Sequence, residues 1–260
     1  MGKRIWIMNH YATDMFFNQG GRHYWFAENL IKNGYETTIF CANTRHNSDD
    51  IVDLKNEKYL IKSTNDIPFV FVPTTPYAGN GASRVKNMVS FYKNLFPVTK
   101  EYAKKYGKPD VILASSVHPL TLVAGIKIAK KFGIPCICEV RDLWPEAIFA
   151  FNKSKEKSIL GRTLVAGEHW IYKNANALVF TKEGDTDYIK EKKWDTGQGG
   201  KINLDKCFYI NNGIDIEDFN QNIKDFVVDD PDLNSDKFNV VYAGSIRPVN
   251  DVGKIVSAAR

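Results

Sequence analysis

The stretch VILASSVHPLTLVAGIKIAKKFGIPCICEV, residues 111–140, decides the fold of this chain. It opens with a short apolar run at 111–114 and closes with a second one at 136–140, and a segment of helical length at 122–132 lies between them. Gly133 and Pro135 follow that segment and are residues that end helices. A β-rich run, a helix and another β-rich run predict a βαβ unit, in which both strands lie parallel in one sheet.

The same alternation continues on both sides of this stretch. It predicts an α/β fold, with a Rossmann-like parallel sheet flanked by helices. One helix is expected to begin near Gly20 and to end at Asn33 and Gly34. The other apolar runs lie at 5–8, 37–41, 69–72, 177–180 and 207–210, and the other segments of helical length lie at 83–106, 158–173 and 183–192.

The composition is that of an ordinary globular protein. Of the 260 residues, 43% are hydrophobic and 25% are charged, which excludes disorder, collagen and coiled coil. No apolar run approaches the roughly 18 residues of a membrane-spanning helix, and the first residues lack the apolar core of a signal peptide. The four cysteines are scattered, so we expect buried free thiols, with a metal site as the minority alternative. These features predict a cytoplasmic protein.

A change of composition divides the chain. Residues 215–237 hold eight acids against two lysines and few packing residues. We predict one domain at 1–219, an acidic linker at 220–237, and the first strand and helix of a second domain at 238–260. In that last part, a buried strand is expected at 238–243, a turn at Gly244 and a helix at 249–260. Its 23 residues are too few for a core of their own, so either they pack on the first domain or the second domain is truncated in this chain, as the domain prediction above has it.

Residues 81–108 carry seven basic side chains and one acid, interleaved with apolar and aromatic residues. Such a segment suits an anionic membrane surface, with the apolar residues of 91–96 inserting shallowly and Pro97 interrupting or kinking the helix. A core helix with a solvated lysine face is an equally good interpretation. No nucleic-acid partner is expected, because the basic residues occupy one local stretch. The side chains assigned to the membrane surface are Arg84, Lys86, Lys93 and Lys100.

Gly20 and Gly21 precede Arg22 at the predicted start of a helix. Adjacent glycines let backbone N–H groups approach a ligand, and a helix N-terminus carries the positive end of the helix dipole, so this loop is expected to attract phosphate. Tight packing of the helix on the sheet is the alternative. The pattern differs from G-x-G-x-x-G and no carboxylate ends the second predicted strand, so a NAD-dependent oxidoreductase is disfavoured.

Two further loops follow predicted strands, where ligands of open α/β sheets bind. His118 and Pro119 lie between the run at 111–114 and the next helix, and this position favours a functional role over a packing role for the imidazole. The motif EVRDLWPE at 139–146 places charges and an indole at the end of a buried strand. Arg141 and Asp142 are expected either to pair with each other or to bind substrate.

Five motifs in order along the chain carry a resemblance: GGR at 20–22, HP at 118–119, EVRDLWPE at 139–146, NNGID at 211–215 and VVYAGSIRPVNDV at 240–252. Together they resemble retaining GT-B glycosyltransferases of family 4, the bacterial enzymes of capsule, O-antigen and exopolysaccharide assembly. The resemblance implies two Rossmann-like domains that face a cleft. The first would bind the acceptor and the second the nucleotide-sugar donor.

The resemblance also implies roles for particular residues. Gly20, Gly21 and Arg22 would form the loop near the donor phosphates and the acceptor, and His118 would act as the catalytic residue that contacts the donor sugar. Arg141 and Asp142 would lie on the acceptor side. Many relatives hold the donor diphosphate with Arg directly after the glycine at the Gly244 position and Lys five residues later. This chain has Ser245 and Asn250 at those positions, so Arg247 would substitute.

The activity so implied is transfer of a sugar, with retention, from a nucleotide diphosphate-sugar to a saccharide acceptor in cell-surface polysaccharide synthesis. We expect this acceptor to be lipid-linked. No cofactor, metal or protein nucleophile is expected, because the leaving diphosphate can accept the acceptor's proton. The family's donor-binding carboxylates would lie beyond Arg260, so this chain alone is expected to be inactive. The protein is expected in the cytoplasm, either free or at the inner face of the membrane. Two alternatives stay open: a non-catalytic module that docks acceptor or membrane, and a GT-B sugar-nucleotide epimerase.

Overall fold

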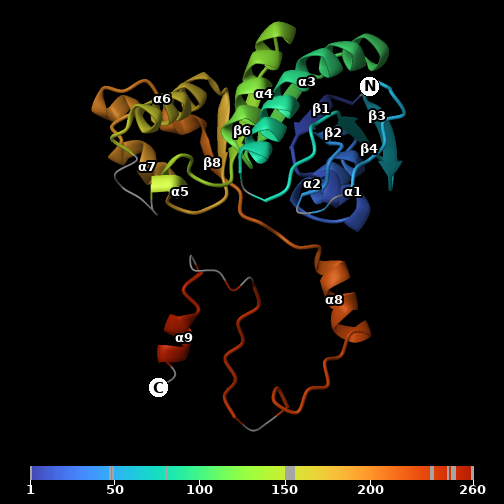
Figure 1. Cartoon of the computed structure of the whole chain (residues 1–260), viewed down its shortest axis with the longest axis vertical. Helices are drawn as coiled ribbons and strands as arrows, with labels where there is room; N and C mark the ends of the chain where they lie inside the picture. Colours follow the sequence, from blue (N-terminus) through green and yellow to red (C-terminus); the bar gives the residue numbers. More distant parts are fainter. Residues whose placement is uncertain are drawn as a thin grey trace. The chain divides into compact units, whose positions relative to one another are not determined.

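The computed structural model describes residues 2–46, 48, 50–79, 81–149, 156–234, 237–244, 246 and 250–258. It divides the chain into two units, Met1–Ile214 and Asp215–Arg260 (Figure 1).

The described part of the first unit holds one sheet of eight strands, in the order β3-β4-β2-β1-β5-β6-β7-β8. Neighbouring strands are parallel except for the antiparallel pair β3 and β4. The mostly parallel sheet predicted from the sequence is therefore confirmed. The strands are β1 (Arg4–Met8), β2 (Glu36–Ala42), β3 (Leu60–Thr64), β4 (Ile67–Val72), β5 (Val111–Ser115), β6 (Cys136–Val140), β7 (Ala177–Phe180) and β8 (Cys207–Tyr209).

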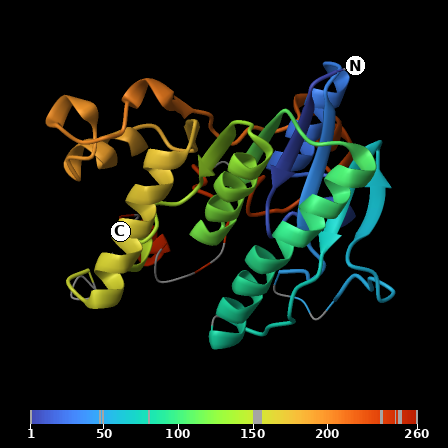
Figure 2. The same cartoon turned by 90° about the horizontal axis from the view of Figure 1, so that it is seen from above.

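Helices cover both faces of this sheet. Figures 1 and 2 show α3 and α4 lying side by side, and they pack on the same face as α6, whereas α2 packs on β2 and β4 from the opposite face. The helices are α1 (Thr13–Asn18), α2 (Arg22–Lys32), α3 (Ala82–Tyr106), α4 (Pro119–Phe132), α5 (Glu146–Phe149), α6 (Ile159–Asn174) and α7 (Asp185–Glu191), with 3₁₀ turns at Thr196–Gln198 and Leu204–Lys206.

Alternation along the central strand β1 explains why there are two cores. Trp6 and Met8 point to the core under α3 and α4, whereas Ile5 and Ile7 point to the core under α2. Strands covered on both faces read as nearly continuous apolar runs, as the sequence of β4 does. At Gly125 the helix α4 approaches β5 so closely that an added Cβ would lie 2.5 Å from the Cβ of Ala114.

The strand order sets the position of the functional edge. From β1 the chain moves outward to β2 on one side, and it later returns to place β5 on the other side of β1. The carboxyl ends of β1 and β5 therefore lie next to each other at the point where the topology switches direction. Ligands of open α/β sheets bind in the crevice at such a point.

Within the basic segment at 81–108, one helix, α3, continues through Pro97, so an interruption of the helix at Pro97 is wrong, whereas a kink there stays a prediction. Pro97 has no N–H to donate to the carbonyl oxygen of Lys93, four residues earlier. Both residues are exposed, so water can donate to that oxygen instead. Shallow membrane insertion by the residues of 91–96 is wrong as well. Phe91 and Leu95 are fully buried in the core, and Tyr92 and Phe96 pack against it.

The second unit begins at Asp215, five residues before the predicted start of the acidic linker at 220. Asp215 caps α8 (Ile216–Asp225) by accepting hydrogen bonds from the N–H groups of Glu217 at 2.9 Å and Asp218 at 3.0 Å. A helix thus lies across the predicted start of the acidic linker. The unit also contains α9 (Gly253–Ala258), within the helix predicted at 249–260.

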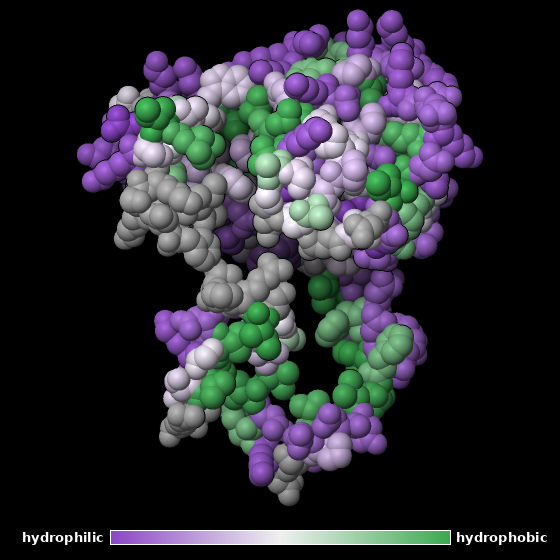
Figure 3. All heavy atoms as spheres, viewed as in Figure 1, coloured by the Kyte–Doolittle hydropathy of each residue, from purple (hydrophilic) through white to green (hydrophobic). Residues whose placement is uncertain are grey.

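The buried strand predicted at 238–243 does not form. Phe238 is 93% exposed and Val240 is 70% exposed, and no described strand of this unit lies beside them. A strand needs a neighbour for its backbone hydrogen bonds, so the apolar sequence alone does not produce one here. Figure 3 shows hydrophobic side chains gathered on the surface of this unit.

Candidate functional site

Polar side chains gather where β1, β5 and β6 end at the carboxyl edge of the sheet. Asn9 and His10 follow β1, Ser115 and His118 come at the end of β5 and just after it, and Glu139 lies near the end of β6. All five are buried, with exposed fractions of 1% or less. Buried polar groups are retained when they bind one another or a ligand, so the edge is the candidate site.

Glu139 is the centre of one half of this site. Its carboxylate accepts hydrogen bonds from Arg22 Nε at 2.7 Å, His23 Nε2 at 2.8 Å and Ser115 Oγ at 2.6 Å. Burial alone would raise the pKa of Glu139, but the hydrogen bonds from His23 and Ser115 and the charge of Arg22 outweigh burial and hold it at about 2. The group is therefore an anion at neutral pH.

Arg22 joins three segments of the first unit. Besides its contact with Glu139, its guanidinium donates to the carbonyl oxygens of Ile210 at 2.8 Å and Asn211 at 2.7 Å. The side chain is 7% exposed and lies over the ring of Phe26. Its polar atoms thus face the protein, and phosphate binding by the loop at Gly20–Arg22 stays a prediction that depends on the backbone.

The backbone of that loop keeps the features that the prediction used. Gly21 has φ of 105°, a left-handed conformation that favours glycine, and no side chain caps the first turn of α2. The N–H groups of this turn therefore have no side-chain acceptor among the described residues. Gly20 and Gly21 are partly exposed.

His23 has a defined hydrogen-bonding state. Asn9 Nδ2 lies 2.8 Å from His23 Nδ1, while Asn9 Oδ1 accepts from the N–H of Tyr11. The amide nitrogen of Asn9 thus donates to His23 Nδ1, and the ring donates from Nε2 to Glu139. Asn9, His23 and the role of Glu139 were not predicted from the sequence.

A histidine pair forms the other half of the site. His10 Nδ1 lies 2.6 Å from His118 Nε2, and the two rings meet edge to face. Burial, followed by the charge of Arg84, lowers the pKa of His118 to about 3. Burial and the neighbouring His118 lower the pKa of His10 well below its usual value. Both rings are therefore neutral at pH 7.

A column of aromatic rings runs from the core past this pair. Phe91 stacks on His10 with centroids 4.4 Å apart, His10 lies 4.6 Å from Tyr11, and Tyr11 stacks on His46 at 4.5 Å. His46 Nδ1 and the hydroxyl of Tyr77 form a hydrogen bond at the partly exposed end. The column fixes the planes of the two central rings.

Arg84 lies at this site. Its Nε donates to the hydroxyl of Tyr11 at 3.1 Å, and its charge lowers the pKa of both histidines of the pair. Of the residues assigned to a membrane surface, Lys86, Lys93 and Lys100 are exposed on α3, whereas Arg84 is partly buried beside Tyr11. For those three lysines, membrane binding stays a prediction.

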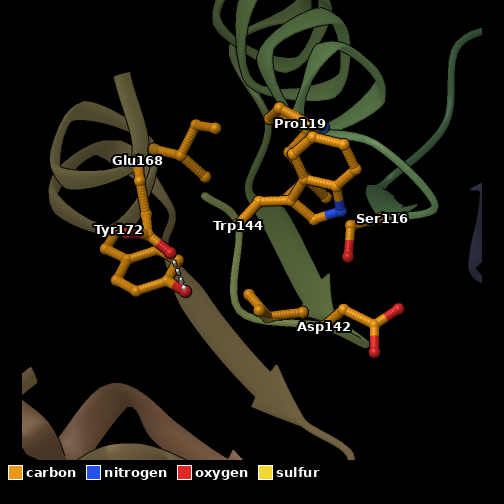
Figure 4. A pocket seen from close by; sticks show the side chains of 9 residues that line it. Ser116, Pro119, Asp142, Trp144, Glu168 and Tyr172 are labelled. Atoms are coloured by element: carbon orange, nitrogen blue, oxygen red, sulfur yellow. Dashed lines mark hydrogen bonds between the residues drawn. The ribbon is translucent and has the colours of Figure 1, made fainter. Parts of the chain in front are cut away.

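A second polar group lies in an apolar pocket between α4 and α6, shown in Figure 4. Glu168 accepts hydrogen bonds from the hydroxyls of Tyr172 at 3.0 Å and Tyr188 at 2.7 Å. Burial raises the pKa of Glu168 to about 7, against the opposing effect of the two phenols. The adjoining cavity of about 150 Å³ is lined by Pro119, Trp144, Leu164, Gly167 and their neighbours.

The loop after β6 carries Arg141 and Asp142, for which the sequence suggested an ion pair with each other. Asp142 Oδ1 lies 3.5 Å from Lys182 Nζ, and no ion pair joins it to Arg141 in the part of the chain that the structure describes. The exposed Asp142 faces the neighbouring loop, while the Arg141 backbone N–H donates to Ser116 Oγ. A role of either residue on the acceptor side stays a prediction. Arg247 lies outside the described residues.

The thiols follow expectation in part. Cys41, Cys136 and Cys138 are free and buried, as predicted, whereas Cys207 is only half-buried. None of the described helices is long and apolar enough to cross a membrane.

Comparison with known families identifies the first unit. Residues 21–198 match the family model described as Glycosyl transferase 4-like domain, and the chain belongs to this family. The match begins at the second glycine of the loop before α2 and includes both His118 and Glu139. No curated protein sequence matches the chain.

Solved structures with a similar fold include several glycosyltransferases. LpCGTa in complex with UDP is 6% identical with a TM-score of 0.49, covering 85% of this chain and 56% of that chain. MurG of Acinetobacter baumannii is 13% identical with a TM-score of 0.40, covering 82% and 47%. HepE of Anabaena, in complex with UDP and glucose, is 12% identical with a TM-score of 0.44, covering 85% and 49%. This chain thus spans about half the length of these proteins.

Proposed function

We propose that the first unit is the acceptor-binding domain of a retaining GT-B glycosyltransferase of family 4. The match of residues 21–198 to a glycosyltransferase domain carries this proposal. The polar groups at the carboxyl edge of β1, β5 and β6 support it, because they occupy the crevice where such sheets bind ligands. The donor is a nucleotide diphosphate-sugar.

The neutral histidine pair suits recognition of a sugar. A neutral imidazole donates or accepts one hydrogen bond without attracting an anion, whereas the diphosphate of a donor requires N–H groups or cations. His118 is the N-cap residue of α4 and is 1% exposed, so a sugar reaches it only when a neighbouring side chain moves. In this proposal His118 contacts the transferred sugar, and the first turn of α2 faces the phosphates.

The reaction needs no nucleophile from the protein. The leaving diphosphate takes the proton of the attacking hydroxyl on the same face of the sugar, so the configuration at the anomeric carbon is retained. The protein then contributes by positioning the two substrates and by stabilising the charge of the leaving group. We infer that this proceeds without a metal ion or cofactor.

The acceptor is proposed to be a saccharide linked to a lipid, in the synthesis of a cell-surface polysaccharide. Lys86, Lys93 and Lys100 on α3 support this, because exposed basic residues attract an anionic membrane at which such an acceptor lies. The cytoplasmic face of the membrane is then the place of reaction.

The test is turnover of nucleotide sugars by the protein in its full natural length. A panel of UDP-, GDP- and TDP-sugars is incubated with saccharide acceptors, and release of nucleoside diphosphate is measured together with the anomeric configuration of the product by NMR. We expect transfer with retention, and no turnover by residues 1–260 alone. An inverted product, or turnover by the 260-residue chain, contradicts the proposal in its present form.

A further inference from the structure

His10 and Asn87 carry an inference that rests on the proposed role of His118. Both side chains are fully buried, and two of their polar atoms, Nε2 of His10 and Oδ1 of Asn87, have no hydrogen-bond partner of normal geometry among the described residues. Asn87 Nδ2 donates to the carbonyl of Thr75 at 2.6 Å and to the hydroxyl of Thr44 at 3.1 Å. These two bonds fix the amide, so its oxygen is the atom left for His10.

The effect of Asn87 on His10 agrees with this orientation. Burial and then His118 lower the pKa of His10, and Asn87 opposes them by raising it. A side-chain oxygen raises the pKa of an imidazole by accepting its N–H, whereas an amide N–H₂ group would not. Because unpaired buried polar atoms are costly, His10 carries its hydrogen on Nε2 and directs it to Asn87.

This assignment settles the direction of the hydrogen bond between the histidines. With hydrogen on Nε2, Nδ1 of the neutral His10 is an acceptor, so in the 2.6 Å contact the donor is His118 Nε2. His118 is neutral too, which leaves its Nδ1 without hydrogen. That nitrogen is buried and has no partner among the residues that the structure describes.

The aromatic column prevents His10 from turning away from this arrangement. The ring of Phe91 lies 4.4 Å from the ring of His10 at an interplanar angle of 4°. The carbonyl oxygen of His10 also accepts a hydrogen bond from the N–H of Ala42 at the end of β2. Backbone and ring are therefore both held.

We propose that His10 and Asn87 are positioning residues that hold His118 in the tautomer with hydrogen on Nε2, so that Nδ1 accepts a hydrogen bond from a sugar hydroxyl. Thr121 supports this ligand chemistry. It is the third residue of α4, and its buried hydroxyl also lacks a partner among the described residues.

Side chains at the N-cap and third positions of a helix lie next to each other. A hydroxyl group can donate to His118 Nδ1 and accept from the Thr121 hydroxyl, whereas a carboxylate or phosphate meets the lone pair of Nδ1 unfavourably. The site at the N-terminal turn of α4 thus selects a hydroxyl group.

NMR of the ring nitrogens in ¹⁵N-histidine-labelled residues 1–260 tests the tautomer directly. We expect both His10 and His118 to carry hydrogen on Nε2 alone at pH 7. His118 with hydrogen on Nδ1 overturns the proposal, and this result needs no variant and no substrate.

Substitutions of His10 test its role as the positioning residue. His10→Phe keeps an aromatic ring between Phe91 and Tyr11 but removes both ring nitrogens, so His118 is expected to interconvert between its tautomers. His10→Asn keeps an oxygen acceptor near the position of Nδ1 and is expected to preserve the tautomer of His118. Thr121→Val is the control and should leave the tautomer of His118 unchanged. A wild-type His118 spectrum in a folded His10→Phe variant overturns the proposal.

Kinetics of the full-length protein add the functional consequence. His10→Phe is expected to lower kcat about 10-fold with little change in KM, because an interaction realised in the transition state is misplaced, and His10→Asn should recover much of the loss. Equal kcat for the wild type, His10→Phe and His10→Asn contradicts a positioning role. If NMR shows the predicted tautomer but the full-length protein turns over no nucleotide sugar, the positioning arrangement is supported and the proposed function is contradicted.

Discussion

Two buried glutamates of the first unit, Glu139 and Glu168, have opposite pKa shifts. Their exposed fractions are 0% and 4%, so burial disfavours the anion in both. Glu139 nevertheless has a pKa of about 2, because Arg22, His23 and Ser115 all direct hydrogen atoms at it. Glu168 has only the hydroxyls of Tyr172 and Tyr188, and its pKa rises to about 7. The number and kind of hydrogen-bond partners therefore decide the charge of a buried carboxyl group.

The two groups therefore give stability opposite dependences on pH. The pKa of Glu139 lies below its ordinary value of 4.5, so its contribution is present above pH 4.5 and is lost as the pH falls towards 2. The pKa of Glu168 lies above 4.5, so its contribution is present below pH 4.5 and is lost as the pH rises through about 7. Variants at each position separate these effects.

The largest effect is expected from Glu139→Gln. An amide removes the charge opposite Arg22 and turns an N–H₂ group towards donors that faced a carboxylate, so about 3 to 5 kcal/mol of unfolding free energy should be lost at pH 7. Urea unfolding measures this loss. Ser115→Ala removes one hydrogen bond but keeps the charge, and should cost about 1 kcal/mol. A loss below that of Ser115→Ala would show that Arg22 does not depend on Glu139.

Glu168→Gln should change the pH dependence of stability more than stability at low pH. Between pH 4.5 and pH 8 the wild-type protein is expected to lose about 3 kcal/mol through this group, at 1.36 kcal/mol for each pKa unit. The glutamine variant has no proton to lose, so its urea midpoint should stay nearly constant over the same range. Parallel pH profiles for the two proteins would refute the raised pKa.

The smallest effect concerns charges that are exposed instead of buried. Lys93→Glu combined with Lys100→Glu should weaken salt-sensitive binding to anionic vesicles, since each basic residue near the surface contributes on the order of 1 kcal/mol. Because the aromatic residues of α3 are packed in the core, binding should be electrostatic and absent on neutral vesicles. Lys55→Glu with Lys62→Glu makes the same change of charge on other exposed positions. Equal co-sedimentation of both double variants contradicts a membrane role for α3.

Periodicity and turn residues were sufficient to predict the parallel strands of the sheet and most of its helices, but they missed the antiparallel edge strand β3. The strands of the βαβ unit at 111–140 are formed within one residue of their predicted ends, because each is an apolar run between helix-ending or loop residues. The strand predicted at 238–243 failed because pairing depends on a neighbour, which local sequence does not supply. The helix predicted at 83–106 is formed, and Pro97 does not interrupt it because tertiary packing outweighs one lost backbone hydrogen bond.

The site was predicted in part. The rule that ligands bind at the carboxyl ends of strands pointed to His118, and applied to β1 it would also have found Asn9 and His10. His23, Glu168 and Asn87 gave no such signal, because each lies inside a helix and reaches its partners only through the fold. Arg22 was assigned to a ligand from its place beside two glycines, but its charge is used to hold Glu139 ionised.

The central claim is that the edge between β1 and β5 is where sugar transfer takes place. It is tested most directly by kcat of the full-length protein with His118→Ala, measured well below the melting temperature because the change also removes the bond to His10. His169→Ala is the matched control, because His169 lies on α6 and its ring packs against Trp194. We predict that kcat falls at least about 10-fold for His118→Ala and stays near the wild-type value for His169→Ala. An unchanged kcat for His118→Ala would contradict the claim.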